Sequence, residues 1–564
     1  MKSQVWLIAV LIFTAGCQRI QPQLLEVVQD VQDFAFQPTS AKTATPFQPL
    51  QPTLTHTPGA VPRLAFDESA PPGLRAGVSL EGLVAMADQG EAANLVLGVD
   101  AAAESRQQSD WLYVLVAPFP TVVDGVGMDT VKGAWAGEPS GTFSGAPLMM
   151  SPETHAAFTA LWGDPADGSV AVLQAGDLLD LAWDVMPSWA LLPFEALEPR
   201  WKALRVDGMS PLDRDFDPAV YPLRVTFGLS GDAQALRILQ ERPEEASVIL
   251  PPSNRDVSKM TTVVLTGVTA LVRSIGDKME TKGMTYPGED IREWLVEADL
   301  THVSNESSFA SDCPHADPFQ ADLRFCSRPE YIELLEYVEV DIVELSGNHI
   351  LDWSTTAFIE TLAMYRSRDW HYYAGGKDET EAQQPLLVEH NGNRLAFIGC
   401  NSVGPTHAWA SGDKPGAANC GDYEWIKAEI SDLAEDGYIV IVTLQHNEFN
   451  VLTSTPYQRR DFPALSAAGA AIVSGSQAHY PNPFDFYEGR FIHYGLGNLF
   501  FDQMDVFIAP GIQREFIDRH IFYDGRHIST EILTAHLEDF SRPRPMTEEE
   551  RNAFLTEAFT ASGW

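Results

Sequence analysis

The stretch YIVIVTLQHNE, residues 438–448, decides the fold of the second half of this chain. Its first seven residues are mostly apolar and β-branched, which is typical of a strand buried on both faces of a sheet. Polar side chains follow at once, and His446 and Glu448 are among them. Because loops that follow such strands gather at the carboxyl edge of an α/β sheet, we expect His446 and Glu448 to lie at a functional edge.

Three other strand-like runs end in the same way. Between them the chain has amphipathic helical stretches at 287–299, 329–340 and 354–369, and this alternation is typical of α/β sheets. Ser354 is the expected N-cap of the last of these helices. The polar clusters at the strand ends are Ser304-Asn305-Glu306, Gly347-Asn348-His349, Gln445-His446-Asn447-Glu448 and Gly475-Ser476-Gln477-Ala478-His479.

Each cluster also has a purely structural interpretation. Asn, Gly and Ser are ordinary turn residues, and a single His often only hydrogen-bonds within a fold. Four clusters at equivalent strand ends favour a shared pocket, in which His and carboxylate side chains suggest metal binding or acid/base catalysis. The candidate catalytic residues are His349, His446, His479, Glu306 and Glu448.

Composition divides the rest of the chain. The segment QPTSAKTATPFQPLQPTLTHTPG is rich in Pro, Thr and Gln, so residues 18–62 are expected to form an extended tether. The remaining residues, about 500, exceed one ordinary domain, and PPSNRD at 251–256 is a turn-rich boundary. We predict an α/β domain at 63–250 and a second domain at 255–535. For the tail at 536–564 we expect a proline-rich linker and a surface helix.

The first 17 residues predict export. Lys2 precedes an apolar run from Val5 to Phe13 and small residues before Cys17, as in a signal peptide. The run is shorter than the ~20 residues needed to cross a bilayer. Residues 14–17, TAGC, resemble the lipobox of bacterial lipoproteins, which implies lipidation at Cys17, a membrane anchor and an extracytoplasmic location. An ordinary cleaved signal peptide is the alternative.

An exported chain enters an oxidising compartment, in which the other four cysteines are able to form disulfides. Sequence proximity suggests the pairs Cys313 with Cys326 and Cys400 with Cys420. Free buried thiols or a zinc site are the alternatives, although the spacings lack the paired CxxC form that is typical of zinc sites.

The chain is strongly acidic. It has 78 acidic and 37 basic side chains and a formal net charge of −41. Such a charge opposes any general affinity for nucleic acid or for anionic lipid headgroups. We therefore expect no nucleic-acid partner.

The strand-end motifs resemble those of CapA-type capsule-synthesis proteins. GNHILD (347–352), the HNE around His446, GSQAH (475–479) and YGLGNLFFDQ (494–503) occur in the order seen in that family, and the resemblance covers nearly all of residues 262–505. It implies an α/β/β/α sandwich similar to calcineurin-like metallophosphoesterases. It also implies a role in making, releasing or anchoring an envelope polymer such as poly-γ-glutamate or a polysaccharide.

The resemblance also implies roles for single residues. Glu306, Asn348, His446 and His479 match positions that would hold one divalent metal ion, Mn or Zn. The supporting residues that it implies are Asn305, Asn348, Asp352, Gln477 and Asn498. In the amino-terminal domain, residues 188–211 resemble part of periplasmic phosphate-type binding proteins, which implies a ligand-binding domain.

Two departures from the family pattern bear on function. Val268 follows Gly267 where the family commonly has Asp, and Ser476 and Gln477 stand where His is common. Because a divalent ion needs its charge and coordination number supplied, these changes weaken a two-metal site. Two hypotheses follow: a hydrolase or polymer transferase, or a catalytically degenerate module that binds an anionic or glycan polymer.

Overall fold

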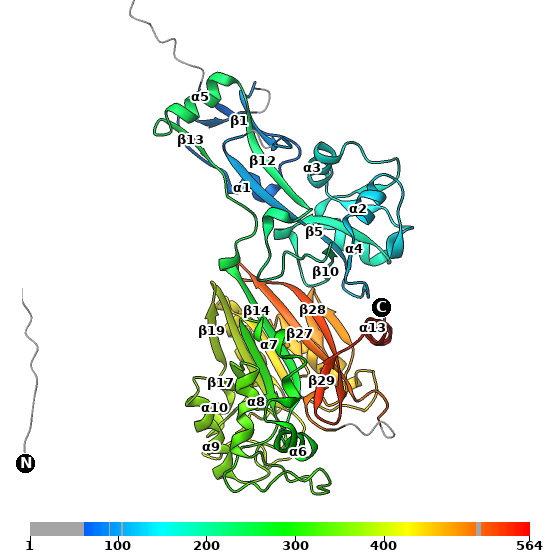
Figure 1. Cartoon of the computed structure of the whole chain (residues 1–564). Helices are drawn as coiled ribbons and strands as arrows, with labels where there is room; N and C mark the ends of the chain where they lie inside the picture. The colour runs from blue at the N-terminus through cyan, green and yellow to red at the C-terminus, as the bar shows by residue number, and fades with distance from the viewer. Residues whose placement is uncertain (1–60, 89–90, 103–104, 504–508) are drawn as a thin grey trace, which may run out of the picture. The chain divides into compact units, whose positions relative to one another are not determined.

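The computed structural model describes residues 61–88, 91–102, 105–503 and 509–564 (Figure 1). Residues 60–564 form one compact unit. The expected signal peptide, the expected lipidation site at Cys17 and nearly all of the expected tether lie outside the described residues. In the part of the chain that is described, no helix is both long enough and apolar enough to span a membrane.

The amino-terminal region is built on a mixed sheet of nine strands. Parallel and antiparallel pairs occur in it, and β10 (Trp201–Ala203) pairs with β5 off the main path. Across the sheet the strands run β3 (Ala85–Met86), β1 (Arg63–Phe66), β4 (Leu95–Val99), β12 (Arg224–Gly231), β5 (Gln108–Pro118), β9 (Trp189–Pro193), β7 (Leu148–Met150) and β8 (Val170–Val172).

Helices and two small sheets complete this region. The helices are α1 (Pro72–Gly77), α2 (Met128–Trp135), α3 (Pro152–Trp162), α4 (Leu178–Asp184) and α5 (Ala233–Glu241). The small sheets pair β6 (Gly125–Val126) with β11 (Arg205–Val206) and β2 (Ser79–Gly82) with β13 (Ala246–Ile249). The region therefore has the expected α/β character.

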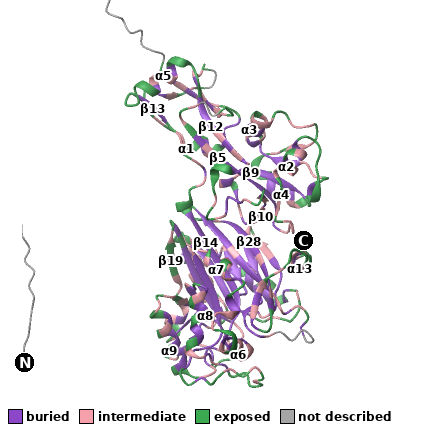
Figure 2. Ribbon diagram, in the orientation of Figure 1, coloured by how far each residue is buried: buried purple, intermediate pink, exposed green. Residues whose placement is uncertain are grey.

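The carboxy-terminal region contains two larger sheets, and the first has eight strands. Its order is β17 (His371–Tyr373), β16 (Ile342–Glu344), β15 (Leu300–Asn305), β14 (Met260–Thr269), β27 (Arg514–Tyr523), β28 (Arg526–Glu538) and β29 (Arg542–Pro545), and β26 (Asn498–Phe500) pairs with the end of β14. β14 is buried along its whole length (Figure 2), as expected for a central strand.

The second sheet has six strands, four of them parallel. Its order is β19 (Leu386–His390), β20 (Asn393–Asn401), β22 (Ile439–Gln445), β23 (Ile472–Ser474), β25 (Arg490–His493) and β24 (Phe484–Tyr487). A separate short pair joins β18 (Gly375–Gly376) to β21 (Gly416–Ala417).

The core clusters show four layers. Val263 and Leu265 of β14 pack with Ile441 of β22, so the two sheets lie face to face, whereas Val264 packs with helices on the outer side of the first sheet. Those helices include α6 (Arg273–Lys282), α7 (Arg292–Val296), α8 (Ile332–Tyr337) and α9 (Thr355–Arg366), and α11 (Glu424–Glu435) and α12 (Pro456–Ala467) cover the second sheet. The expected α/β/β/α sandwich is confirmed.

Local expectations also hold at several points. The side chain of Ser354 accepts a hydrogen bond from the backbone N–H of Ala357 and caps α9. The structure joins Cys313 to Cys326 and Cys400 to Cys420 in disulfides, the two pairs that proximity suggests.

The carboxy-terminal segment differs from the expectation. The proline-rich stretch at 541–545 is not a linker, because β29 pairs with β28 through residues 535–538. Helix α13 (Glu548–Ser562) buries Phe554, Leu555 and Phe559 in the cluster between the two sheets, so it is more than a surface helix. Pro543 and Pro545 are compatible with β29 because this strand lies at the edge of its sheet.

Candidate functional site

The four polar clusters follow the carboxyl ends of four parallel strands. Two of these strands, β15 and β16, belong to the first sheet, and the other two, β22 and β23, belong to the second. The candidate site therefore draws on both sheets of the sandwich.

Glu306 lies at the centre of the contacts among these clusters. Its side chain is fully buried, and both carboxylate oxygens lack a hydrogen-bond partner among the described residues. Its backbone N–H donates to the carbonyl oxygen of Thr269 at 2.8 Å, which fixes the loop after β15 against the end of β14. A Cβ atom at Gly347 would lie 2.8 Å from the Cα atom of Glu306, so the two loops pack as closely as glycine allows.

His479 approaches Glu306 from the second sheet. Its Nε2 atom is 3.7 Å from Oε1 of Glu306, and its Nδ1 atom is 2.9 Å from Oδ1 of Asn498. Because an amide oxygen only accepts, Nδ1 carries the proton and Nε2 faces the carboxylate. Asn498 therefore orients the His479 ring so that Nε2 is on the side of Glu306.

His349 is oriented by a carboxylate. Its Nδ1 atom is 2.6 Å from Oδ2 of Asp352, and the same oxygen accepts the backbone N–H of Phe325 at 3.0 Å. Burial alone lowers the pKa of His349, but the hydrogen bond to Asp352 and the charges of Glu306 and Asp352 outweigh it, so the pKa is raised. The shift favours the imidazolium form relative to a free imidazole.

Glu448 and His446 have contacts of another kind. The carboxylate of Glu448 accepts the backbone N–H groups of His479 at 2.9 Å and Tyr480 at 3.0 Å, and so holds the loop that carries His479. Burial raises the pKa of Glu448; the charge of His479 and the two N–H donors oppose this effect, and the charge of Glu306 adds to it. The Nε2 atom of His446 is instead 3.0 Å from Asp461 on α12.

The remaining expected residues lie in the same loops. Asn305 donates to Ser307 and to the Tyr365 hydroxyl, at 2.7 and 2.8 Å. Asn348 Oδ1 and both amide atoms of Gln477 are buried without a hydrogen-bond partner among the described residues. Their buried polar atoms, like those of Glu306, are groups that a bound polar ligand or water would satisfy.

The structure adds Arg273, which sequence reasoning missed. Its guanidinium donates to Asp502 and lies 5.0 Å from the ring centres of both Phe325 and Phe501. Phe325 contacts the ring of His349 and Phe501 contacts that of His479. Arg273 thus packs against the two aromatic rings that contact the histidines, and Asp502 pairs its charge. In the sequence, Arg273 is recognisable only as a basic residue shortly after the end of β14.

Arg273 also lines a pocket of ≈ 470 Å³. Arg324, Tyr331, Trp353 and the disulfide between Cys313 and Cys326 line it too, whereas His349 and His479 do not. Pockets of about 300–1,000 Å³ are typical of small-ligand sites, so this one has room for a small ligand.

Glu344 explains one departure from the family pattern. It is fully buried at the end of β16 and accepts hydrogen bonds from Ser304, Ser346 and Ser476. Burial raises the pKa of Glu344 and the three serine hydroxyls oppose the rise. Ser476 stands where the family commonly has His; here it joins the second sheet to a carboxylate of the first.

The residues present do not fit a metal centre. Val268, which replaces the usual Asp, is fully buried in an apolar cluster with Phe325 and Phe501. Among the described residues, no group of three or more His, Cys, Asp or Glu side chains is placed to hold a metal ion. His446, one of the expected ligands, hydrogen-bonds Asp461 instead. We therefore derive no step through a metal.

The layers and the strand-end site define the class of this protein. It contains an α/β/β/α sandwich with a cluster of His and Glu side chains at the carboxyl ends of strands from both sheets.

Comparison with known proteins agrees with the resemblance to CapA-type proteins. Residues 262–503 match the family "Bacterial capsule synthesis protein PGA_cap". A capsule biosynthesis protein CapA of Bacillus anthracis is 21% identical over 265 residues, which cover 46% of this chain and 64% of that protein. A PGA biosynthesis protein CapA of Bacillus subtilis (strain 168) is 26% identical over 187 residues, or 33% of this chain and 49% of that protein. The matches span about half to two thirds of these relatives.

Solved structures give weaker similarities. A 5′-nucleotidase precursor from Thermus thermophilus is 13% identical with a TM-score of 0.30, covering 54% of this chain and 58% of that one. An ABC-type phosphate transport receptor from Vibrio cholerae is also 13% identical, with a TM-score of 0.22, covering 30% of this chain and 87% of that one. We base no argument on scores this low.

Proposed function

We propose that this protein is a lipid-anchored, extracytoplasmic hydrolase or transferase that acts on an envelope polymer, such as poly-γ-glutamate or a polysaccharide. The observation that carries the proposal is the buried Glu306 carboxylate, whose oxygens have no hydrogen-bond partner among the described residues and which lies 3.7 Å from His479. A buried charge costs stability unless it is paired. Its position beside the oriented imidazole of His479 favours acid/base chemistry.

The proposed chemistry is acyl transfer. Nε2 of His479 takes a proton from water or from an acceptor amine as it attacks the amide carbonyl, and the Glu306 carboxylate, 3.7 Å away, stabilises the imidazolium that forms. His349, whose raised pKa favours the imidazolium, stabilises the negative charge that develops on the carbonyl oxygen. The same imidazole returns the proton to the departing amine, so that water gives hydrolysis and an amine gives transfer.

The pocket beside Arg273 supports a polymeric substrate. Its volume of ≈ 470 Å³ is adequate for a short polymer segment, and Arg273 and Arg324 line it together with Asp317 and Asp322. Arg273 is paired with Asp502, so Arg324 is the side chain proposed to bind a carboxylate of the polymer.

The test is incubation of the purified full chain with poly-γ-glutamate, with and without a primary amine. Chain length is followed by size-exclusion chromatography and new end groups by mass spectrometry. We expect shortened or amine-capped polymer with the wild type and none with Glu306→Gln. Exposed Glu360 on α9 gives the matched control, Glu360→Gln, which should behave as wild type. Unchanged polymer with the wild type would contradict the proposal for this substrate.

The second candidate is a binding module without turnover. The observation that favours it is Val268. This residue stands where the family commonly has Asp, and it is buried in an apolar cluster. This hypothesis predicts that wild type and Glu306→Gln bind polymer equally and that neither changes its length. Equilibrium binding by fluorescence anisotropy, measured on the same samples, separates the two hypotheses.

A further inference from the structure

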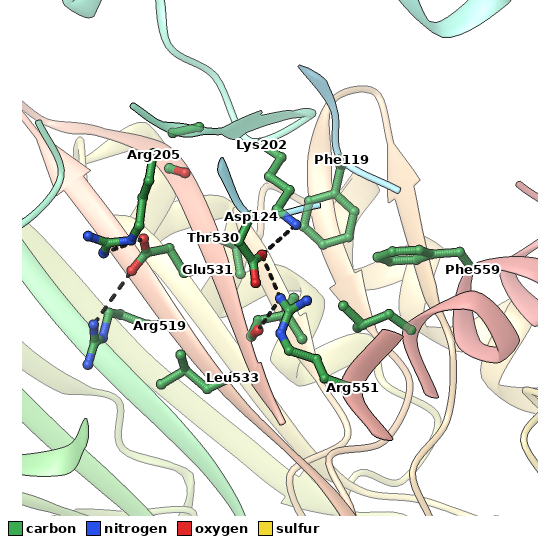
Figure 3. A pocket seen from close by; sticks show the side chains of 14 residues that line it. Phe119, Asp124, Lys202, Arg205, Arg519, Thr530, Glu531, Leu533, Arg551 and Phe559 are labelled. Carbon is green, nitrogen blue, oxygen red and sulfur yellow. Dashed lines mark hydrogen bonds and ion pairs between the residues drawn. The ribbon is translucent and has the colours of Figure 1, made fainter. Parts of the chain in front are cut away.

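Figure 3 shows a cavity between β10, β28 and α13 whose charged side chains already pair with one another. The pairs are Asp124 with Lys202 and Arg551, and Glu531 with Arg205 and Arg519. The pocket of ≈ 470 Å³ that Arg273 lines is different. A covalent bond that a thiol can exchange, the disulfide between Cys313 and Cys326, forms part of its wall.

The two disulfides of the chain differ in burial. Cys400 and Cys420 are both fully buried and pack in the core that α11 and α12 cover. Cys313 is 8% exposed and Cys326 is partly exposed, and both line the pocket. Because exchange requires a thiolate to reach a sulfur atom, the disulfide at the pocket is the one that a reagent can attack in the folded protein.

The loop between Cys313 and Cys326 has little structure of its own. Residues 306–328, all of which the structure describes, contain neither helix nor strand apart from a single isolated bridge. The side chains of Phe319 and Leu323 are 89% and 63% exposed. A segment with so little burial opens at a low cost in free energy, so the disulfide has a large share in holding it closed.

The end of this loop contacts the residues that orient His349. The backbone N–H of Phe325 donates to Oδ2 of Asp352 at 3.0 Å, and Nδ1 of His349 is 2.6 Å from the same oxygen. The guanidinium of Arg324 donates to the carbonyl oxygens of Asp352 and Trp353 at 2.9 and 2.8 Å. The ring of Phe325 also contacts that of His349. The disulfide is one residue further along the chain, so it holds these contacts in place.

We propose that the disulfide between Cys313 and Cys326 is a site of thiol–disulfide exchange with a dithiol, and that its reduction frees residues 314–325 from Asp352. A thiolate of the dithiol attacks Sγ of the more exposed Cys326, the Sγ–Sγ bond breaks, and Cys313 leaves as a thiolate that takes up a proton. The second thiol of the reagent then attacks the mixed disulfide and releases Cys326. Two electrons and two protons pass to the cysteines, and the dithiol becomes a disulfide. The proposal does not depend on the reaction of the Glu306 site.

The first test measures which disulfide reacts in the folded protein. The purified full chain is incubated without denaturant with dithiothreitol, a small dithiol, or with reduced thioredoxin, a protein dithiol. New thiols are blocked with iodoacetamide and located by peptide mass spectrometry. In at least one arm we expect labelling of Cys313 and Cys326, while Cys400 and Cys420 stay joined; reaction with dithiothreitol alone means that the pocket admits a small dithiol and excludes a protein. No labelling of the first pair in either arm, or equal labelling of both pairs, would overturn the proposal.

The second test measures release of the loop by hydrogen–deuterium exchange. In the reduced protein the Phe325 amide should exchange at least about tenfold faster, because the loss of a loop-closing bond favours the open loop. The double variant Cys313→Ala with Cys326→Ala should exchange equally fast without reductant and should not respond to dithiothreitol. The amide of Val442, in the middle of the buried strand β22, is the internal control and should keep its rate. An unchanged rate at Phe325 after complete reduction, or an equal acceleration at Val442, would contradict the proposal.

Discussion

Glu344 gives the sharpest test of how the two sheets are held together at the site. It is fully buried and accepts hydrogen bonds from Ser304 of its own sheet, at 2.6 Å, and from Ser476 of the opposite sheet. Ser346 is a third donor. The perturbations are Glu344→Ala, which removes the acceptor, and Glu344→Gln, which keeps the volume and one acceptor oxygen.

The magnitude follows from the number of donors. A buried donor that loses its partner costs about 1–3 kcal/mol. Three hydroxyls lose theirs in Glu344→Ala, so we expect the free energy of unfolding to fall by at least about 3 kcal/mol. Glu344→Gln should cost about 1–2 kcal/mol. The exposed control Glu360→Gln should stay within about 0.5 kcal/mol of the wild type.

The pH dependence of the free energy of unfolding shows whether ionisation of Glu344 stabilises or destabilises the folded protein. Burial raises the pKa of Glu344 in the folded protein above its unfolded value, which is about 4.3. This contribution to stability is complete below the unfolded pKa and is lost as the pH rises through the folded pKa. The glutamine variant cannot ionise at this position, so its stability deficit should shrink as the pH is raised.

The assay is urea denaturation of the full chain at several pH values above 4, followed by tryptophan fluorescence. A loss of less than about 1 kcal/mol in Glu344→Ala would refute the reasoning, because it would mean that the serines do not depend on this carboxylate. A deficit of Glu344→Gln that grows with pH would refute the electrostatic part.

Three further predictions concern the loops around the site. Asp352→Asn should lower the pKa of His349, measured by NMR titration, because a carboxylate that favours the imidazolium is lost; an unchanged pKa would contradict this. Removing the disulfide by Cys313→Ser with Cys326→Ser frees a loop with a sequence separation of 13 and should lower the free energy of unfolding by about 3 kcal/mol in urea titrations; an unaltered stability would contradict it. Elemental analysis of the purified chain should find no stoichiometric Mn or Zn, because the donor set among the described residues does not suit a metal centre, and one bound equivalent would overturn that conclusion.

Much of the fold could be predicted from the sequence. The buried runs that become β14 and β22 are continuous and apolar, and this composition specifies central strands of a covered sheet. Ser354 specifies a helix start through its own side chain. These signals are local, because the residues that form each strand or helix also carry the pattern that predicts it.

The carboxy-terminal segment could not be predicted in the same way. The prolines of residues 541–545 favour a linker when the sequence is considered alone. They are acceptable in β29 because it forms the last strand of its sheet, next to β28. Edge position is a property of the assembled sheet, and no local pattern carries it.

The sequence predicts which strand ends carry the site residues, but it does not predict which side chains contact one another. Glu306, His479 and His349 come together because their loops follow strands of two sheets that face each other. The partner of His446, Asp461, lies one helix later, and its position depends on how α12 packs. Arg273 is recognisable only after Phe325 and Phe501 are placed around it.

Glu306 and His479 are proposed to act together in acid/base chemistry. The most direct test is to measure kcat on poly-γ-glutamate for Glu306→Gln, His479→Asn and the double variant. Removing a general acid/base group costs about 10²–10⁴ in rate. Groups that act as a unit are not additive, so the account predicts a large loss in each single variant and little further loss in the double one. Single variants that keep the wild-type kcat, or losses that multiply in the double variant, would contradict the account.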